Sequence, residues 1–251
     1  MSNTEDDNVG NKKIKSKIKT SYSQMSVGAA QERLGIRFED IEVVAPSKML
    51  IESTHNVEKL DKLKEKVYER IVEFLSVEGY PEEGTLYFKE ANVNDLVYSI
   101  ISPVIHFMQQ ETGHKLRLTR EKEITSIDDL TEGQEEFIVL DYITVTEERY
   151  LLIIEAKRSG IGVGMKQILL ALKDAWDNNR KCGNVYGFVT TGVDWRWIRY
   201  DGESFVKSDD MRVLFNRMKE DKLGWITEYS GLINCILSAL TEVTKDTVVR
   251  I

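Results

Sequence analysis

Two apolar runs of the chain end in charged residues whose types suit phosphodiester chemistry. The first run ends at Asp141, and the second ends 14 residues later in the triplet Glu155-Ala156-Lys157. Carboxylates are hard oxygen ligands for Mg²⁺, and a divalent cation neutralises phosphate charge and activates a water. A lysine nearby can polarise that water or stabilise the transition state. The pattern therefore indicates a metal-dependent site that cuts phosphodiester bonds; the alternative is a surface ion pair at a strand end.

The context of the triplet favours the site. The spacing Glu-x-Lys also occurs at Glu220–Lys222, but there it lies in a polar run with no apolar strand before it. Glu155 follows five apolar or aromatic residues. Charged groups that follow a buried strand directly lie at a sheet edge or in a cleft, where partial desolvation strengthens their fields.

The charge of the chain changes sign at this triplet. Residues 121–155 hold 11 acidic and 2 basic side chains, whereas residues 157–199 hold 8 basic and 3 acidic ones. An acidic metal site beside a basic surface is what chemistry on a phosphate backbone requires. The net charge of −8 argues against simple electrostatic coating of nucleic acid. Accidental clustering on solvated faces is the alternative.

Composition indicates a globular protein. With 251 residues and 41% hydrophobic content, the chain can bury a full core. No apolar run approaches the roughly 20 residues needed to span a bilayer, so we expect no membrane association. The two cysteines give no disulfide framework, and the polar N-terminus shows no secretory signal. We expect an intracellular protein of the nucleus or cytoplasm.

Hydrophobic patterning divides the chain into four parts. Residues 1–45 are rich in Ser, Asn and charge and read as a disordered tail; the lysine-rich stretch 12–19 is a solvated tail, a nuclear address or a phosphate-binding arm. We expect a helical N-terminal extension over 46–82, a core over 83–205 and C-terminal helices over 206–251 that pack on that core.

Periodicity predicts the elements that position the charged residues. Apolar spacing of three and four indicates helices over 56–78, 90–111, 165–178, 209–219 and 224–243, and short apolar runs indicate strands over 136–145, 149–156, 185–191 and 195–200. The fold class is therefore α/β, with a sheet flanked by helices. Glu90 begins the second helix on its buried side, where it serves either the site or the helix dipole.

The stretch from Glu90 to Tyr200 resembles the PD-(D/E)XK nuclease superfamily, whose core is the restriction-endonuclease-like fold. The resemblance rests on Asp141, on Glu155-Ala156-Lys157, and on Gln167, ten residues beyond Lys157 on the next helix. The proline of the motif is replaced by Leu140. The phrases around residues 152–158 and 186–192 are also similar to fungal members of this superfamily.

The resemblance implies a Mg²⁺- or Mn²⁺-dependent nuclease. It implies metal ligation by Asp141, Glu155, the Ala156 carbonyl and Glu90, with Asp95 as a weaker alternative to Glu90, and catalytic roles for Lys157 and Gln167. DNA is the expected substrate ahead of RNA.

A basic segment follows the triplet. We expect Lys166, Lys173 and Arg158 to contact the phosphate backbone; Lys166 and Lys173 are seven apart and so share one helix face.

A catalytically inactive module of the same fold, which binds nucleic acid or a protein partner, is the competing interpretation. The C-terminal helices could also form a homodimer or bind a protein partner.

Overall fold

The computed structural model describes residues 19–51, 55–81 and 88–248, and the expectations for residues 1–18 lie outside this part of the chain. Its helices are α1 (Val27–Leu34), α2 (Val57–Glu78), α3 (Glu90–Thr112), α4 (Ile161–Asn178), α5 (Lys222–Tyr229) and α6 (Gly231–Val248). Its strands are β1 (Thr20–Ser21), β2 (Glu42–Val44), β3 (Leu116–Thr125), β4 (Thr131–Tyr142), β5 (Glu148–Ala156), β6 (Val185–Thr190), β7 (Asp194–Tyr200), β8 (Phe205–Ser208) and β9 (Met211–Arg212).

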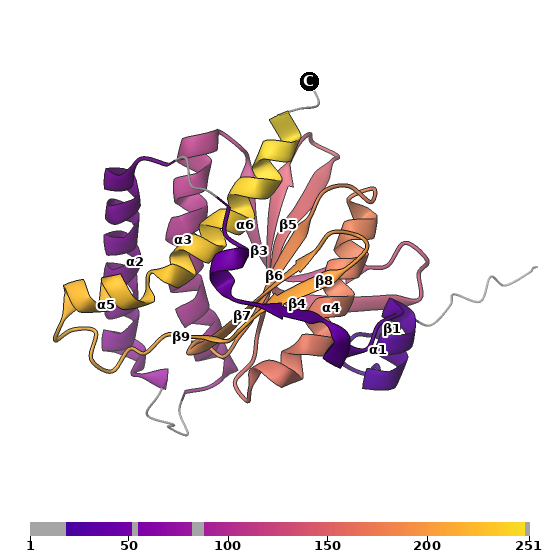
Figure 1. The fold of residues 1–251 in the computed structure, drawn as a ribbon, viewed down its shortest axis with the longest axis horizontal. Coiled ribbons are helices and arrows are strands. Elements are labelled where there is room, and N and C mark those ends of the chain that lie inside the picture. Colours follow the sequence, from indigo (N-terminus) through magenta and orange to yellow (C-terminus); the bar gives the residue numbers. More distant parts are fainter. Residues whose placement is uncertain (1–18, 52–54, 82–87, 249–251) are drawn as a thin grey trace, which may run out of the picture.

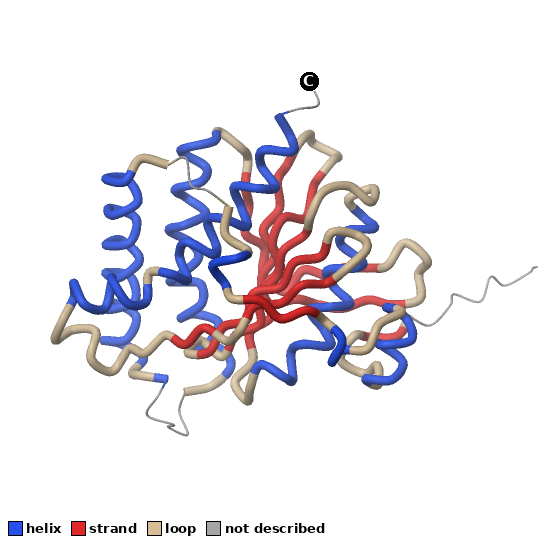
Figure 2. The backbone as a smooth tube through the Cα atoms, viewed as in Figure 1, coloured by secondary structure: helices blue, strands red, loops and turns tan. Residues whose placement is uncertain are grey.

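One mixed sheet of nine strands forms the centre of the described structure, with helices on both faces (Figure 1). Helices α2, α3 and α6 lie on one face, and α1 and α4 lie on the other (Figures 1 and 2). Each face buries its own apolar cluster, so the sheet is apolar on both sides as expected for an α/β fold. The predicted α/β class is confirmed.

The middle of the sheet is a meander followed by a crossover. β3, β4 and β5 pair antiparallel in chain order, and α4 then crosses to β6, which pairs parallel with β5. α3 precedes the meander and packs against β3 and β5. β1 joins in parallel at Thr131–Glu132 of β4, beyond the end of β5. The end of β5 therefore stays paired with β6, while β4 continues past it to pair with β1.

Seven predicted elements are confirmed, and one long strand was not predicted. The helices over 56–78, 90–111 and 165–178 match α2, α3 and α4, and the four predicted strands match β4, β5, β6 and β7. The sequence interpretation missed β3, because this edge strand is charged and half exposed and has no long apolar run.

The C-terminal region differs from its expectation at two places. The segment expected as a helix over 209–219 begins with strand β9, because Met211 pairs with Trp195 and Asp210 accepts a hydrogen bond from Arg196. Phe215 is buried without forming a helix. The helix expected over 224–243 is two helices, α5 and α6, with Ser230 between them. α6 packs on α3.

The expected disordered tail is wrong for residues 19–45. This segment contains β1, α1 and β2, and its Tyr22 is fully buried. Tyr22, Ala30 and Ile41 join the apolar cluster on the α4 face, and Met25, Leu34, Ile36 and Phe38 pack against it. No helix in the described residues combines the length and apolar character required to cross a bilayer.

Candidate functional site

Two glutamates and a lysine meet where β5 ends. Glu135 of β4 and Glu155 of β5 are both fully buried, and their carboxyl groups interact. Lys157 Nζ lies 2.6 Å from Glu155 Oε1. Apart from this ion pair and the contact between the two carboxyl groups, the oxygens of both glutamates have no hydrogen-bond donor in the described structure. Buried carboxylates without donors are costly, so this pair is suited to hold a proton or a cation.

Glu135 reaches Glu155 because β4 changes the face on which its side chains lie. Thr131 donates a hydrogen bond to Asp174 of α4, which places it on the α4 face, and Glu135 lies on the same face beside Glu155. Phe137 belongs to the apolar cluster on the opposite face. In a regular strand, residues two apart share a face, so the alternation is interrupted between Glu135 and Phe137.

α4 lies directly over Glu155 at Gly164. A Cβ at this position would be 2.8 Å from Val189 Cγ1 and 3.0 Å from Glu155 Cγ. Glycine therefore lets the first turns of α4 approach the carboxylate and the stem of Lys157, whose Cγ would be 3.5 Å from such a Cβ.

Burial controls the electrostatics of this pair. Burial raises the pKa of Glu135 well above its usual value, and the negative charge of Glu155 raises it further. Burial likewise raises the pKa of Glu155, although Lys157 opposes this. Burial alone would lower the pKa of Lys157, but Glu155 and the neighbouring acids outweigh it and raise the pKa. Lys157 is thus a fixed cation beside two carboxyl groups that resist being charged together.

Two further acidic residues face Lys157 from the other side. Glu90, the first residue of α3, lies 3.4 Å from Lys157 Nζ. Glu136 also interacts with Lys157 and accepts a hydrogen bond of 2.6 Å from Asn94 Nδ2 of α3. Burial raises the pKa of Glu136, while Lys157 and Asn94 oppose the rise. The sequence prediction that Glu90 and Lys157 lie in one site is therefore consistent with the geometry.

A cleft of about 490 Å³ opens over Glu135. Its lining is strongly polar and comes from β1 and the residues after it, from β3 and β4, and from Gln167 of α4. The residues are Ser21, Ser23, Glu121, Glu123, Glu132, Gly133, Gln134, Glu135, Glu136 and Gln167. Gln167 thus lines the same cleft as Glu135, whereas the sequence interpretation had placed it with Asp141 and Glu155.

Asp141 does not belong to this site. It pairs with Arg149 at the other end of β5, and Arg149 precedes Glu155 by six residues, which corresponds to roughly 20 Å along a strand. Its buried carboxylate lies 2.7 Å from His114 Nδ1. The sequence interpretation placed Asp141 beside Glu155 because both end apolar runs, but in an antiparallel pair the ends of the two strands point in opposite directions.

The carboxylate that lies beside Glu155 is Glu135, which the sequence interpretation missed. It lies just before the apolar run 137–140, and antiparallel pairing brings the beginning of β4 beside the end of β5. Antiparallel pairing of the two predicted strands is the signal that identifies this residue. With that pairing, the residues opposite Glu155 lie near residue 135. Asp95, the alternative to Glu90, instead pairs with Arg120 on the surface.

The predicted phosphate-binding lysines have partners within the protein. Lys166 donates hydrogen bonds to the backbone carbonyl oxygens of Ser23, at 2.9 Å, and of Met25. Lys173 forms an ion pair with Asp177. Arg158 is exposed just beyond the site. The shared helix face of Lys166 and Lys173 is therefore occupied by internal contacts.

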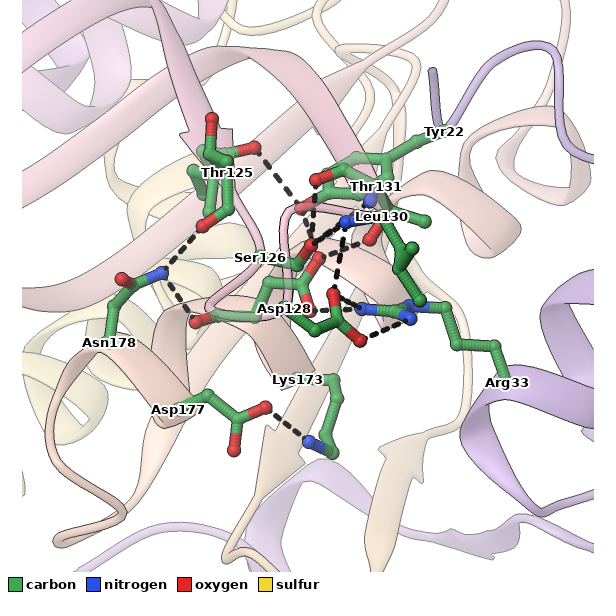
Figure 3. A network of polar contacts seen from close by, with 12 residues as sticks. Tyr22, Arg33, Thr125, Ser126, Asp128, Leu130, Thr131, Lys173, Asp177 and Asn178 are labelled. Carbon is green, nitrogen blue, oxygen red and sulfur yellow. Dashed lines mark hydrogen bonds and ion pairs between the residues drawn. The ribbon is translucent and has the colours of Figure 1, made fainter. Parts of the chain in front are cut away.

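A buried polar network fixes the N-terminal segment against α4 (Figure 3). Tyr22 Oη donates to Asp174 Oδ2 at 2.7 Å, and Arg33 contacts both Asp174, at 3.4 Å, and Asp128, at 3.1 Å. Asp174 is 1% exposed. The Tyr22 ring covers Gly133, where a Cβ would be 2.0 Å from Tyr22 Cδ2. These contacts hold β1 and Ser23 at the edge of the cleft.

No group of three or more His, Cys, Asp or Glu side chains among the described residues has a geometry ready to hold a metal ion. In this structure the ammonium of Lys157 occupies the position next to the acidic pair.

In comparisons with known proteins, no family model matches the chain, and no curated protein is significantly similar to it.

Proposed function

We propose that the protein is a metal-dependent nuclease of the PD-(D/E)XK type, with Glu135, Glu155 and Lys157 at its centre. The observation that carries this proposal is the buried pair Glu135–Glu155, whose oxygens lack hydrogen-bond donors, beside the ammonium of Lys157 and beneath a polar cleft. A buried ionisable cluster in a cleft is where a functional site is expected.

The donor set fits Mg²⁺ or Mn²⁺. Glu135 and Glu155 offer hard oxygen ligands, and the backbone carbonyl of Ala156 and the carboxylate of Glu90 are the further candidates. A divalent cation held there would supply neutralisation of phosphate charge and activation of a water. Charge balance supports such a cation, because burying two carboxylates beside one lysine leaves negative charge without a partner.

The residues of the chain have separate roles in this proposal. Lys157 stays protonated between Glu155 and Glu90 and donates hydrogen bonds to the attacking water or to a phosphate oxygen. Gln167 lines the cleft and can donate from its side-chain amide to the substrate backbone. Glu136, held by Asn94, adds to the negative field that keeps Lys157 charged.

The element order supports the proposal independently of the side chains. A helix, a three-stranded antiparallel meander, a crossover helix and a parallel strand occur in the order α3-β3-β4-β5-α4-β6. This is the order expected of a restriction-endonuclease-like core, with α2 and the C-terminal helices as additions. DNA remains the first substrate to test.

The test is cleavage of single- and double-stranded DNA and of RNA, with Mg²⁺, with Mn²⁺ and with a chelator. We expect cation-dependent cleavage that falls by roughly 10²-fold or more in Glu135→Gln, Glu155→Gln and Lys157→Met, because each loses an interaction made in the transition state. Glu228→Gln, the same change at an exposed residue of α5 outside the cleft, is the matched control. Equal rates in the wild type and Lys157→Met would contradict the proposal.

A second candidate function is a binding module without catalysis. The observation that favours it is the excess of acid on the cleft wall, where Glu121, Glu123 and Glu132 accompany the buried pair. This wall would attract a basic protein segment and repel a phosphate backbone in the absence of cations. Calorimetry with Mn²⁺ separates the two functions: the nuclease requires a binding signal that is lost in Glu155→Gln.

A further inference from the structure

The cleft has two chemically different walls. One wall consists of carboxylates from β3 and β4, including the buried Glu135. The other consists of neutral groups that can donate hydrogen bonds: the hydroxyl groups of Ser21 and Ser23, and the side-chain amide of Gln167 on α4. These two walls suit a ligand with two anionic parts. One part would bind the carboxylate wall through a cation, and the other would accept hydrogen bonds from the serines and the glutamine.

The two serines are arranged to donate into the cleft. Their hydroxyl oxygens lie 2.9 Å apart, so one hydroxyl donates to the other. Each hydroxyl has a single hydrogen, and the hydrogen of the accepting serine is therefore not used by this contact. Ser23 is exposed and Ser21 is half-buried, which leaves the pair accessible from the cleft.

The backbone that carries these serines is fixed from three directions. Ser21 pairs with Glu132 of β4, and Tyr22 between the serines is fully buried with its hydroxyl on Asp174. Lys166 donates to the carbonyl oxygens of Ser23 and Met25. Fixed donors recognise an anion better than mobile ones because less entropy is lost on binding.

Lys166 adds a positive charge behind this wall, on the backbone of Ser23. Its two identified partners are neutral carbonyl oxygens, and no carboxylate of the described residues forms an ion pair with it. Lys173, on the same helix, differs because Asp177 neutralises it. The charge of Lys166 therefore offsets part of the negative field that the cleft carboxylates impose on an anion at Ser21 and Ser23.

We propose that Ser21, Ser23 and Gln167, with Lys166 as the positioning residue behind them, form a subsite for a second phosphate of the substrate, next to the phosphate that is cleaved. The inference rests on the proposed nuclease function for the first phosphate. It assigns the N-terminal segment a direct role in recognising the substrate backbone, with no contact to the bases.

The test compares two small ligands by titration calorimetry in Ca²⁺, which replaces Mg²⁺ to prevent turnover. Thymidine 3′,5′-bisphosphate carries both phosphates, and thymidine 5′-monophosphate carries one. We expect the bisphosphate to bind wild-type protein about tenfold more tightly, since hydrogen bonds to a charged group are among the stronger ones. In Ser21→Ala/Ser23→Ala the ratio should fall to about one to twofold, with monophosphate affinity unchanged.

Two variants of α4 provide the controls. Lys166→Met should lower the affinity ratio, whereas Lys173→Met, the same change seven residues further along, should keep the wild-type ratio. Thermal unfolding of each variant checks that the fold is retained. An unchanged ratio in the folded double-serine variant, or a ratio near one in the wild type, would overturn the subsite.

The subsite and the nuclease function can fail separately. If the wild type binds the bisphosphate more tightly through the serines but cleaves no nucleic acid, the subsite stands and catalysis is excluded. If the wild type cleaves nucleic acid and the ratio does not depend on the serines, the nuclease stands and the subsite is wrong.

Discussion

The carboxyl groups of Glu135 and Glu155 lie against each other below the floor of the cleft, and neither side chain is exposed to solvent. They come from neighbouring antiparallel strands, and among the described residues Lys157 is the cation paired with Glu155, at 2.6 Å. Such a pair is stable when one group is protonated or when a cation lies between them. The stability of the protein should therefore report on both conditions.

The first prediction concerns pH in the absence of divalent cations. Burial and Glu155 raise the pKa of Glu135 in the folded protein, so the protonated form favours folding. This stabilisation is complete below the unfolded pKa of about 4.3 and is lost as the pH rises toward the folded pKa. Glu135→Gln carries no such charge. Its unfolding temperature should match that of the wild type near pH 4 and exceed it by a few degrees, roughly 2–4 °C per kcal/mol, at pH 8.

The control for this prediction is Glu123→Gln, because Glu123 is exposed. Its unfolding temperature should follow that of the wild type at both pH values. Parallel pH profiles for the wild type and Glu135→Gln would mean that the charge of Glu135 does not oppose folding.

The second prediction concerns cations. Mn²⁺ that binds the folded protein alone stabilises it by about 2.7 kcal/mol at a hundredfold excess over Kd, which corresponds to roughly 5–10 °C for a protein of this size. We expect this shift in the wild type and its loss in Glu135→Gln and Glu155→Gln. Differential scanning fluorimetry with and without Mn²⁺ measures it. If Mn²⁺ raised the unfolding temperature of both variants as much as that of the wild type, the cation would bind outside the Glu135–Glu155 pair.

The third prediction separates Asp141 from the site. Asp141 is buried and contacts His114, and it pairs with Arg149 at the opposite end of β5 from Glu155. Asp141→Asn should lower the free energy of unfolding by about 1–3 kcal/mol, because a hydrogen bond to a charged group is weakened. The Mn²⁺ shift and the rate of any cleavage should stay within about threefold of the wild type. Urea denaturation and the cleavage assay measure these effects, and complete loss of cleavage in a folded variant would return Asp141 to the site.

The fourth prediction concerns the buried contact that fixes the N-terminal segment. Tyr22 Oη donates to Asp174, which is 1% exposed. Tyr22→Phe removes a donor to a buried carboxylate and should cost about 1.5–3 kcal/mol of unfolding free energy. Tyr200→Phe is the matched control, because Tyr200 Oη donates at 2.9 Å to the neutral carbonyl oxygen of Gly202; its cost should be about 0.5–1.5 kcal/mol. Equal costs in chemical denaturation would show that the carboxylate is not the stronger partner.

The sequence by itself determined the elements with strong periodicity and the local part of the site. The stripes of α2, α3 and α4 predicted those helices, because every third or fourth residue had to be apolar to pack on the sheet or, for α2, on α3. Glu155-Ala156-Lys157 stood out because charge follows a buried strand directly, and both side chains lie in the site. These features depend on residues close together in the chain.

Only the tertiary structure decided which acid meets Glu155. Asp141 and Glu135 lie on the same strand, and strand direction together with the interruption of alternation near Glu136 brings Glu135 to the site and removes Asp141 from it. The N-terminal segment is ordered for a similar reason. Its apolar residues pack on the α4 face, and its buried polar partner Asp174 is more than 150 positions away from Tyr22 in the chain. Pairings over such separations depend on how distant elements pack, and local propensity does not encode them.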